Sequence, residues 1–354
     1  MVAMDPAYDA AVPTSVPDRP DVDVDVDLDD DVHVDDLVFN IVWTGTVFSA
    51  LRPFTESILA HEPVRLRFLV NACPPEEIAA MEAFAAANGS SVVDVEVVST
   101  GRMLRHGDCL DLVVRNDDDG PLFGLLDPDI LATGPFVDRF LHLLRGRAAV
   151  TSGVELWSSH NVRPADNIGV SGEFFYDQDG FVFGSPHLAI YRRAPLLETM
   201  DRWGVGFSSA GNDIADVTRK RLEALGRSFW VYDTGKVVNI LLQGDGHEVV
   251  HEDLDQLVHV GGLAHFLAPP QATEGAEPEW GQHDRWDIWE GQGPRFQLAG
   301  QAARFLRAQA RGRPLPPPPE GLTPFLAERV DRLRRALATL APPPAPAGDG
   351  STDG

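Results

Sequence analysis

The feature that most constrains the fold is a regular alternation of apolar and helical segments between residues 37 and 155. Segments of strand character lie at 37–43, 64–71, 91–99, 121–129 and 148–155, and segments of helical character at 49–61, 74–89, 106–116 and 134–146. Strands that alternate with helices at this spacing predict an α/β protein with a mostly parallel sheet and helices on both faces. Such a sheet binds its ligands at the carboxyl ends of its strands.

The two ends of the chain have a different composition. Residues 1–36 contain the run DVDVDVDLDDDVHVDD, whose crowded carboxylates repel one another, so we expect a disordered acidic tail, with a partner-binding arm as the alternative. Residues 269–313 are predicted to be an irregular Trp-bearing extension. A Pro-rich linker and an amphipathic helix fill 314–341, and 342–354 is predicted to be disordered. The helix is expected to pack on the domain or on a second copy of the chain.

Charge and cysteine content narrow the classes of partner. The formal net charge of −25 argues against nucleic acid and anionic membrane as partners, because phosphate-rich surfaces attract basic proteins. The two cysteines, Cys73 and Cys109, have neither disulfide-framework nor zinc spacing, so we expect free thiols. Neither a signal peptide nor an apolar run of ~20 residues is found, which predicts a soluble cytoplasmic protein without a transmembrane segment.

The motif LLDPDI at 125–130 is the strongest candidate for chemistry. Asp127 and Asp129 follow an apolar strand and are one residue apart, which places both carboxylates on the same side of the chain. They repel unless a cation lies between them. Mg²⁺ and Mn²⁺ take oxygen ligands and often share their coordination with substrate phosphates, so the motif predicts such an ion beside a nucleotide diphosphate. The alternative is a solvated turn that merely ends the strand.

The order of these elements resembles the GT-A (Rossmann-like) fold of glycosyltransferases, and the family 2 type above all. Residues 37–155 resemble the nucleotide-binding half, with LLDPD in the place of the Asp-x-Asp motif. Residues 156–268 would be the acceptor half. There PHLAIYRR (186–193) is similar to the acceptor-side strand, and NDIADVTRKRLEALG (212–226) to the later acidic helix; a short strand is expected at 229–233.

The resemblance implies roles for residues at the ends of the first two strands. Thr44 and Gly45 would line the nucleoside pocket. Asn71 stands where the family usually has an Asp that reads the base, and this departure leaves the identity of the base open.

The resemblance also implies contacts nearer the motif. Asp111, with Arg102 or Arg105, would contact nucleotide or phosphate. Asp127 would face the ribose or the metal, and Asp129 would be the direct metal ligand.

Later acids and histidines complete the implied site. Asp213, with Asp216 as its rival, matches the general base of inverting members, which takes the proton of the acceptor hydroxyl. His259 is the third expected metal ligand, with His265 and His251 as alternatives. Four aromatic residues are candidates for stacking on the acceptor, or else for core packing: Trp157, Phe174, Phe175 and Tyr176.

These roles predict a hexosyltransferase that moves a sugar from a nucleotide-diphosphate donor to an unknown acceptor with Mn²⁺ or Mg²⁺. The sequence leaves open whether the transfer inverts or retains the configuration at the anomeric carbon of the sugar. One alternative is a sugar-phosphate nucleotidyltransferase, because TGTVFSALRPFT (44–55) loosely resembles the Gly-rich segment of those enzymes, although only Arg52 is basic there. The other is a non-catalytic binding protein that kept the fold.

Overall fold

The computed structural model describes residues 32–116, 120–158, 162–164, 169, 171, 174–185, 187–267, 294–314, 316–318 and 320–340. For residues 265, 266 and 294–297 it describes the backbone alone. Of the acidic tail predicted to be disordered at 1–36, residues 1–31 lie outside the described residues, as do 342–354 and the part of the Trp-bearing extension at 269–293; residues 34–36 of that tail form a short 3-10 helix.

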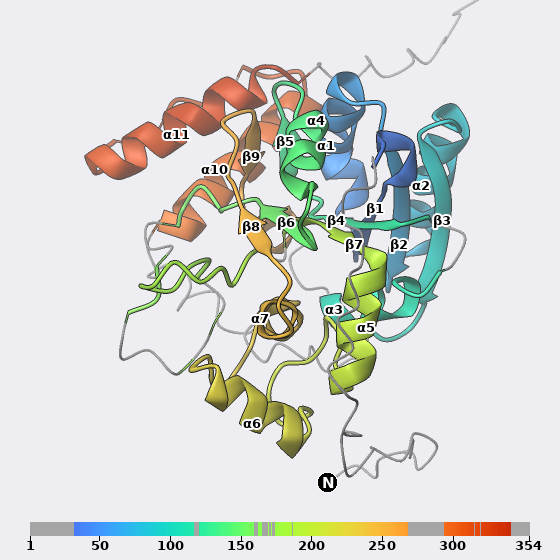
Figure 1. Cartoon of the computed structure of the whole chain (residues 1–354). Coiled ribbons are helices and arrows are strands. Elements are labelled where there is room, and N and C mark those ends of the chain that lie inside the picture. Colours follow the sequence, from blue (N-terminus) through green and yellow to red (C-terminus); the bar gives the residue numbers. More distant parts are fainter. Residues whose placement is uncertain are drawn as a thin grey trace, which may run out of the picture.

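A seven-stranded sheet in the order β3-β2-β1-β4-β7-β6-β8 forms the centre of the molecule (Figure 1). Its strands are β1 (Val38–Thr44), β2 (Arg65–Asn71), β3 (Val92–Ser99), β4 (Leu122–Leu126), β6 (Ala149–Ser152), β7 (Leu188–Arg192) and β8 (Val249–His251). Only β7 runs antiparallel to its neighbours β4 and β6, and the other pairs are parallel. A two-stranded sheet of β5 (Ile130–Ala132) and β9 (Leu257–His259) lies beside it.

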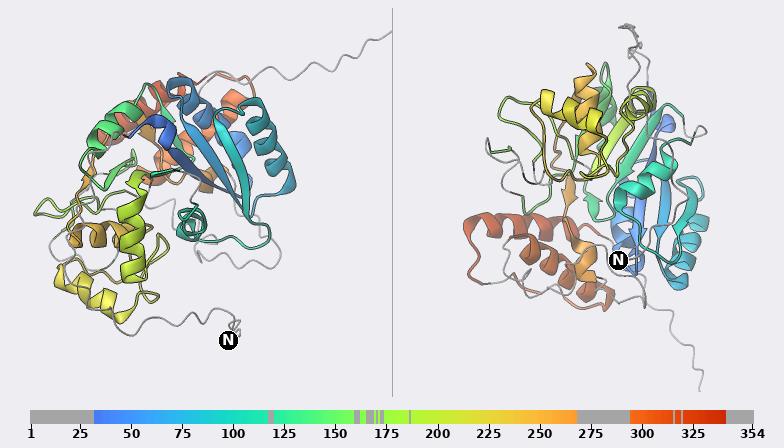
Figure 2. Two further views of the ribbon diagram at one scale, coloured as in Figure 1. Left: turned by 45° about the vertical axis from the view of Figure 1, so that its right-hand side comes forward. Right: turned by 90° about the horizontal axis from the view of Figure 1, so that it is seen from below.

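Helices cover both faces of the large sheet (Figure 2). They are η1 (Val34–Asp36), α1 (Phe48–His61), α2 (Pro75–Ala87), α3 (His106–Val113), α4 (Val137–Leu144), α5 (Arg193–Trp203), α6 (Asp216–Ala224), α7 (Lys236–Gly244), α8 (Leu263–Leu267), α10 (Pro294–Ala310) and α11 (Pro324–Leu337). Strand β1 shows why both faces are covered, because it has apolar side chains on each side. Phe39, Ile41 and Trp43 belong to one buried cluster and Val42 to a second, because successive side chains of a strand point to opposite faces.

The fold class expected from the sequence, an α/β protein with a mostly parallel sheet and helices on both faces, is therefore confirmed. The C-terminal helix α11 buries Leu326, Val330 and Leu333 in the same cluster as α1 and α10, so it packs on the domain. Among the described residues, no helix has both the length and the apolar character needed to cross a membrane.

Several expected elements differ from those observed. The strand predicted at 229–233 is wrong, because this segment is irregular: Val231 is hydrogen bonded to the backbone of residues 169 and 171, but Tyr232 donates instead to the carbonyl of Ala210. Helix α7 was not expected, although Lys236, Asn239 and Gln243 recur at helical spacing; all but its last two residues are buried. The extension predicted to be irregular at 269–313 contains α10, which buries Leu298, Ala302 and Phe305.

Candidate metal centre

The Asp-Pro-Asp motif lies at the carboxyl edge of the large sheet, directly after β4. Because β7 is antiparallel to β4, with Leu126 opposite Leu188, the residue before β7 is brought to this edge. The N–H of Asp127 donates to the carbonyl of His187 over 2.7 Å, which extends the ladder by one step. The reversed strand therefore places the side chain of His187 beside that of Asp127.

His259 reaches the same place through the small sheet. It ends β9 and pairs with Ile130 of β5, the residue after the motif. Its Nε2 lies 3.1 Å from Oδ1 of Asp129 and 3.7 Å from Oδ2 of Asp127. Nδ1 of the ring lies 2.7 Å from the carbonyl oxygen of Gly153, which fixes the ring with Nε2 toward the carboxylates.

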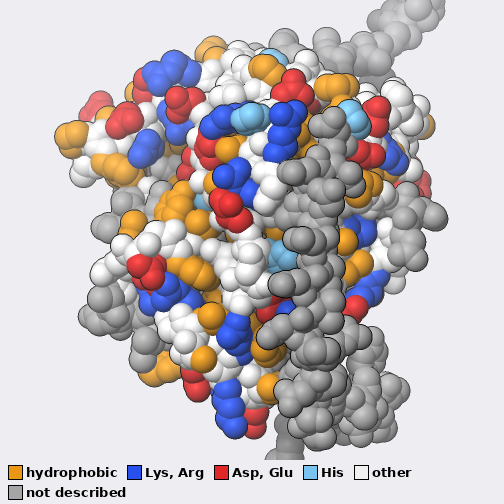
Figure 3. Space-filling view, viewed as in Figure 1, with side chains coloured by type: hydrophobic (Ala, Val, Ile, Leu, Met, Phe, Trp, Pro, Cys, Tyr) orange, Lys and Arg blue, Asp and Glu red, His pale blue; other side chains and the backbone are white. Residues whose placement is uncertain are grey.

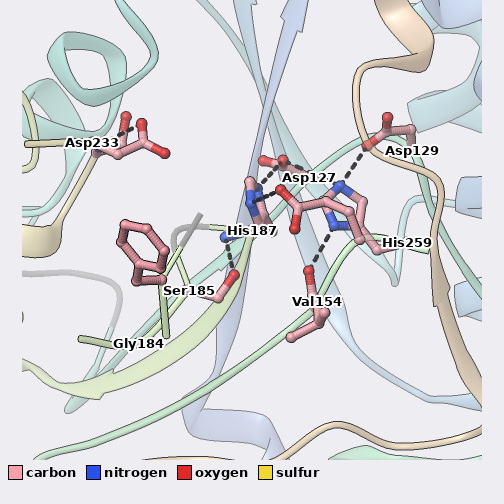
Figure 4. A network of polar contacts seen from close by, with 12 residues as sticks. Asp127, Asp129, Val154, Gly184, Ser185, His187, Asp233 and His259 are labelled. Atoms are coloured by element: carbon pink, nitrogen blue, oxygen red, sulfur yellow. Dashed lines mark hydrogen bonds and ion pairs between the residues drawn. The ribbon is translucent and has the colours of Figure 1, made fainter. Parts of the chain in front are cut away.

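Asp127, His187 and His259 form a group with the geometry of a metal site (Figure 4). One ligand atom from each lies within 4.8 Å of the others, and Nδ1 of His187 is 2.9 Å from Oδ2 of Asp127. One carboxylate oxygen and two imidazole nitrogens suit a transition metal such as Mn²⁺ better than Mg²⁺, which prefers an all-oxygen shell. The donor set thus fits a divalent cation.

Asp129 supports this group from one side. Its Oδ2 accepts the N–H of Leu263 at the start of α8 over 3.0 Å, and its carbonyl accepts the N–H of Val260. Burial opposes its ionisation, but His259, the N–H of Leu263 and His187 together lower the pKa of Asp129 to about 2. It is the oxygen of Asp127, rather than that of Asp129, that lies within the three-residue group.

Glu155 supports the group from the other side. Its Oε1 lies 2.8 Å from Nε2 of His187. Burial opposes its charge, but His187 holds the pKa of Glu155 at about 2. Burial likewise disfavours charge on His187, yet Glu155 and Asp127 together raise its pKa well above the usual value. Without a cation, the imidazoles supply the positive charge between the carboxylates.

His187 and Glu155 were not expected from the sequence. Both follow from the antiparallel course of β7, which brings the start of β7 to the carboxyl end of β6, with Ser152 opposite Leu188. The sequence predicts a strand at PHLAIYRR but not its direction, and only an antiparallel direction brings His187 to the carboxyl ends of β4 and β6. A third histidine, His106 at the start of α3, has its Nε2 3.7 Å from Oδ1 of Asp127.

The residues expected at the nucleoside pocket lie at the same edge. Thr44 and Asn71 are register partners at the ends of β1 and β2, and Gly45 follows with a φ of 56°. The amide of Asn71 is buried and bonds the backbone of Leu104 twice, through Nδ2 to the carbonyl and through Oδ1 to the N–H, each over 2.9 Å. The structure thus shows Asn71 holding a loop to the end of β2.

The residues expected to contact nucleotide or phosphate have partners within the protein. Asp111 accepts the N–H groups of Phe207 and Ser208 and the hydroxyl of Ser208, while burial raises its pKa. Arg105 pairs with Asp108 over 2.8 Å. Arg102 lies exposed in the loop before α3.

Of the two expected base residues, Asp213 lies on the loop before α6 and Asp216 is the first residue of that helix. Oδ1 of Asp213 accepts the N–H groups of Ala210 and Gly211, and its Oδ2 is 3.6 Å from Nη1 of Arg105. Asp216 is exposed at the first position of α6. No interaction recorded among the described residues joins either side chain to the metal group.

Asp233, before α7, was not expected. Figure 4 places it on the side of the metal group opposite Asp129. Its Oδ1 accepts the N–H of Thr234 over 2.8 Å, and its backbone N–H donates to the hydroxyl of Ser171. The described residues show no hydrogen bond or ion pair at its Oδ2.

The alternative histidines and the aromatic residues have structural surroundings. Nδ1 of His251 is 2.8 Å from Oγ1 of Thr151, and Phe175 stacks on the His251 ring. Phe174 and Phe175 are buried, and the hydroxyl of Tyr176 donates to the carbonyl of His251. Trp157 is half-buried against the core. The side chain of His265 lies outside the described residues.

No family model matches this chain, and no curated protein matches it in sequence. Solved structures similar to it include galactosyltransferase LgtC with donor and acceptor sugar analogs, at a TM-score of 0.41 and 13% identity over 74% of this chain and 95% of that one. Mannosyltransferase PcManGT from Pyrobaculum calidifontis, in complex with GDP-Man and Mn²⁺, has a TM-score of 0.35 and 16% identity over 87% and 76%.

A third similar structure belongs to another class of enzyme. The 4-diphosphocytidyl-2C-methyl-D-erythritol synthase from Anaerococcus prevotii has a TM-score of 0.35 and 10% identity, over 61% of this chain and 86% of that one. Glycosyltransferases, which the sequence resembles, are therefore among the similar folds. At TM-scores of 0.35–0.41 and identities of 10–16%, the likeness carries no argument about activity, which depends on the site itself.

Proposed function

We propose that this protein is a glycosyltransferase of the hexosyltransferase type, which moves a sugar from a nucleotide-diphosphate donor to an acceptor. The observation that carries the proposal is the convergence of Asp127, His187 and His259 at the carboxyl edge of the sheet. Ligands of such sheets bind at this edge, and a divalent ion there takes its remaining ligands from a diphosphate.

A bound ion, Mn²⁺ in preference to Mg²⁺, would neutralise the charge that grows on the departing diphosphate. Asp127, His187 and His259 would hold it, with Asp129 and Glu155 fixing the two imidazole rings. Thr44 and Gly45, at the end of β1, would border the nucleoside. Asn71 and Asp111 would act on the donor indirectly, by anchoring the loops at residues 104 and 207–208, and Arg102 would contact it from the loop before α3.

We further propose Asp233 as the carboxylate on the acceptor side, ahead of Asp213 and Asp216. A general base must present an oxygen that can reach the proton of the acceptor hydroxyl, so a carboxylate whose two oxygens already face partners in the protein is less suited to the role. Asp213 has such partners, whereas Oδ2 of Asp233 has none among the described residues.

Calorimetric titration with Mn²⁺ and a set of nucleoside diphosphates tests the proposal. We expect heat of diphosphate binding only when Mn²⁺ is present, and its loss in His259→Ala. His142→Ala is the matched control, because His142 is exposed on α4. Release of diphosphate from one nucleotide sugar would then identify the donor.

Other outcomes would overturn the proposal in different ways. Turnover of a nucleoside triphosphate with a sugar phosphate would indicate a nucleotidyltransferase. That alternative needs a free basic residue near 44–55, but Nε of Arg52 is held by Glu56 over 2.8 Å. Absence of any diphosphate binding would indicate a binding protein that kept the fold.

A further inference from the structure

Helix α7 carries a stripe of three polar side chains at helical spacing, namely Lys236, Asn239 and Gln243. Each donates a hydrogen bond to one of three successive carbonyls, in the order Gly184, Phe183 and Val182. Gly184 permits this close approach, because its φ is 69° and a Cβ there would lie 2.7 Å from Nδ2 of Asn239. The helix thus holds the backbone of residues 182–184.

The segment that α7 holds leads to the metal ligand His187. Ser185 follows it directly and is fully buried, and its Oγ accepts the N–H of His187 over 3.1 Å. Figure 4 shows Ser185 between Gly184 and His187. The ammonium group of Lys236 is therefore linked to the backbone of His187 through two hydrogen bonds, one at the carbonyl of Gly184 and one at the hydroxyl of Ser185.

Lys236 is also joined to the acceptor side of the metal group. Its backbone N–H donates to the carbonyl of Asp233 over 3.1 Å, and Asp233 is the carboxylate proposed above to face the acceptor. Its Nζ donates to the carbonyl of Phe174 over 2.8 Å, in addition to that of Gly184. One residue thus connects the turn before α7 to the segment before β7.

The charge of Lys236 lies in an unusual place for a lysine. On the face of the molecule shown in Figure 3, lysine and arginine side chains lie at the surface among acidic and polar ones, whereas the side chain of Lys236 is fully buried. Among the described residues no ion pair is recorded for it, and burial lowers its pKa to about 8, although Asp233 and Glu155 act in the opposite direction. Because a buried ammonium group is unfavourable unless its hydrogen bonds are well made, the carbonyls of Phe174 and Gly184 are held in fixed positions around it.

We propose that Lys236 is a positioning residue for the metal group, which fixes His187 through the carbonyl of Gly184 and the hydroxyl of Ser185. This inference rests on the proposed function, because it takes His187 as a ligand of a divalent cation.

The position of His187 matters because three ligand atoms must meet at one point. The ligand atom of His187 lies within 4.8 Å of those of Asp127 and His259, so a small shift of its backbone would separate them. Glu155 fixes the orientation of the ring from behind, over 2.8 Å. Lys236 fixes the backbone from which that ring projects.

The test measures the binding of Mn²⁺ alone to the full chain by titration calorimetry. Lys236→Met should lower the affinity by about tenfold, the lower end of the usual effect of losing a partner behind a metal ligand. Ser185→Ala should also lower it, and this variant decides the question if Lys236→Met does not fold, because it removes a single hydroxyl. The visible absorption of Co²⁺ bound at the same site is a second readout, since it depends on the arrangement of the ligands, and it should change in both variants.

Asp245→Asn is the matched control, because Asp245 lies at the other end of α7 and contacts Trp203 and Arg202 instead of residues 182–184. It should lower stability to urea but leave the Mn²⁺ affinity and the Co²⁺ absorption unchanged. Wild-type affinity in Lys236→Met and Ser185→Ala, or an equal loss in Asp245→Asn, would overturn the proposal alone. Absence of Mn²⁺ binding by the wild type would overturn the metal group itself, and this inference with it, so the two failures give different results.

Discussion

Glu155 and His187 form a buried pair in which Oε1 of the acid lies 2.8 Å from Nε2 of the ring, while Nδ1 of the same ring faces Asp127 at 2.9 Å. The imidazole is thus held between two carboxylates, one on the metal side and one behind it. Carboxylates in this position behind a metal-bound histidine fix the orientation of the ring and raise its basicity.

Replacing Glu155 with Gln should therefore weaken Mn²⁺ binding by about 10- to 100-fold, the usual effect of losing such a partner. Titration calorimetry measures the affinity. Glu248→Gln is the control, because Glu248 makes only a surface pair with Arg147. Equal affinity in the two variants would show that Glu155 does not act on the metal.

The stability of the metal-free protein should depend on pH through His187. The pKa of His187 is raised well above its ordinary value of 6.5, so the folded state binds this proton more tightly than the unfolded state. The resulting stabilisation is complete below the ordinary pKa and is lost as the pH rises through the raised one. Thermal unfolding of the chelated protein should occur at lower temperature as the pH increases from about 6.5.

Mn²⁺ should reverse this trend, since it binds neutral imidazole and its affinity rises as the ring loses its proton. His187→Gln should flatten the pH dependence of the metal-free protein. An unchanged profile in that variant would assign the effect to another group.

Lys236 should be structurally essential, because its ammonium group is fully buried and donates to the carbonyls of Phe174 and Gly184. Lys236→Met keeps the shape of the side chain but leaves these carbonyls without their donor, at a cost of ~1–3 kcal/mol in the free energy of unfolding. Urea denaturation measures the loss. Lys220→Met, on the exposed side of α6, should change stability little.

Gly107 should tolerate no side chain. A Cβ there would lie 2.5 Å from the backbone nitrogen of Ser208, where Asp111 fastens the loop to α3. Gly107→Ala should cost ~1–3 kcal/mol by overpacking. Gly101→Ala is the control, since a Cβ at Gly101 would meet nothing within 4 Å. Comparable melting temperatures for the two variants would contradict the packing seen here.

Asp233→Asn should lower kcat by about 10²–10⁴ if Asp233 removes the proton of the acceptor, as is usual for a general base. Binding of Mn²⁺ and nucleoside diphosphate should not change. Steady-state release of diphosphate measures kcat, and calorimetric titration measures the binding. A larger loss in Asp213→Asn than in Asp233→Asn would return the role to the loop before α6.

The sequence indicated the first half of the fold because apolar runs of strand length alternate there with segments of helix length, such as the one that begins at Pro75 and ends before Gly89. It also identified Asp127, Asp129 and His259, which the sheet does bring together. It missed His187 because strand direction is a tertiary property that no local pattern encodes. No helix was predicted at α7, where Lys236, Asn239 and Gln243 recur at helical spacing in a segment of only nine residues.

Because its residues are far apart in the chain, the metal group can form only after β4, β7 and β9 have been brought together. Its members are separated by 60 residues between Asp127 and His187 and by a further segment to His259, which ends the last strand. During synthesis from the N-terminus, the nascent chain therefore cannot hold the ion until that last strand has left the ribosome. Binding of an ion would require the pairing of β5 with β9 but not helices α10 and α11, which follow β9 in the chain.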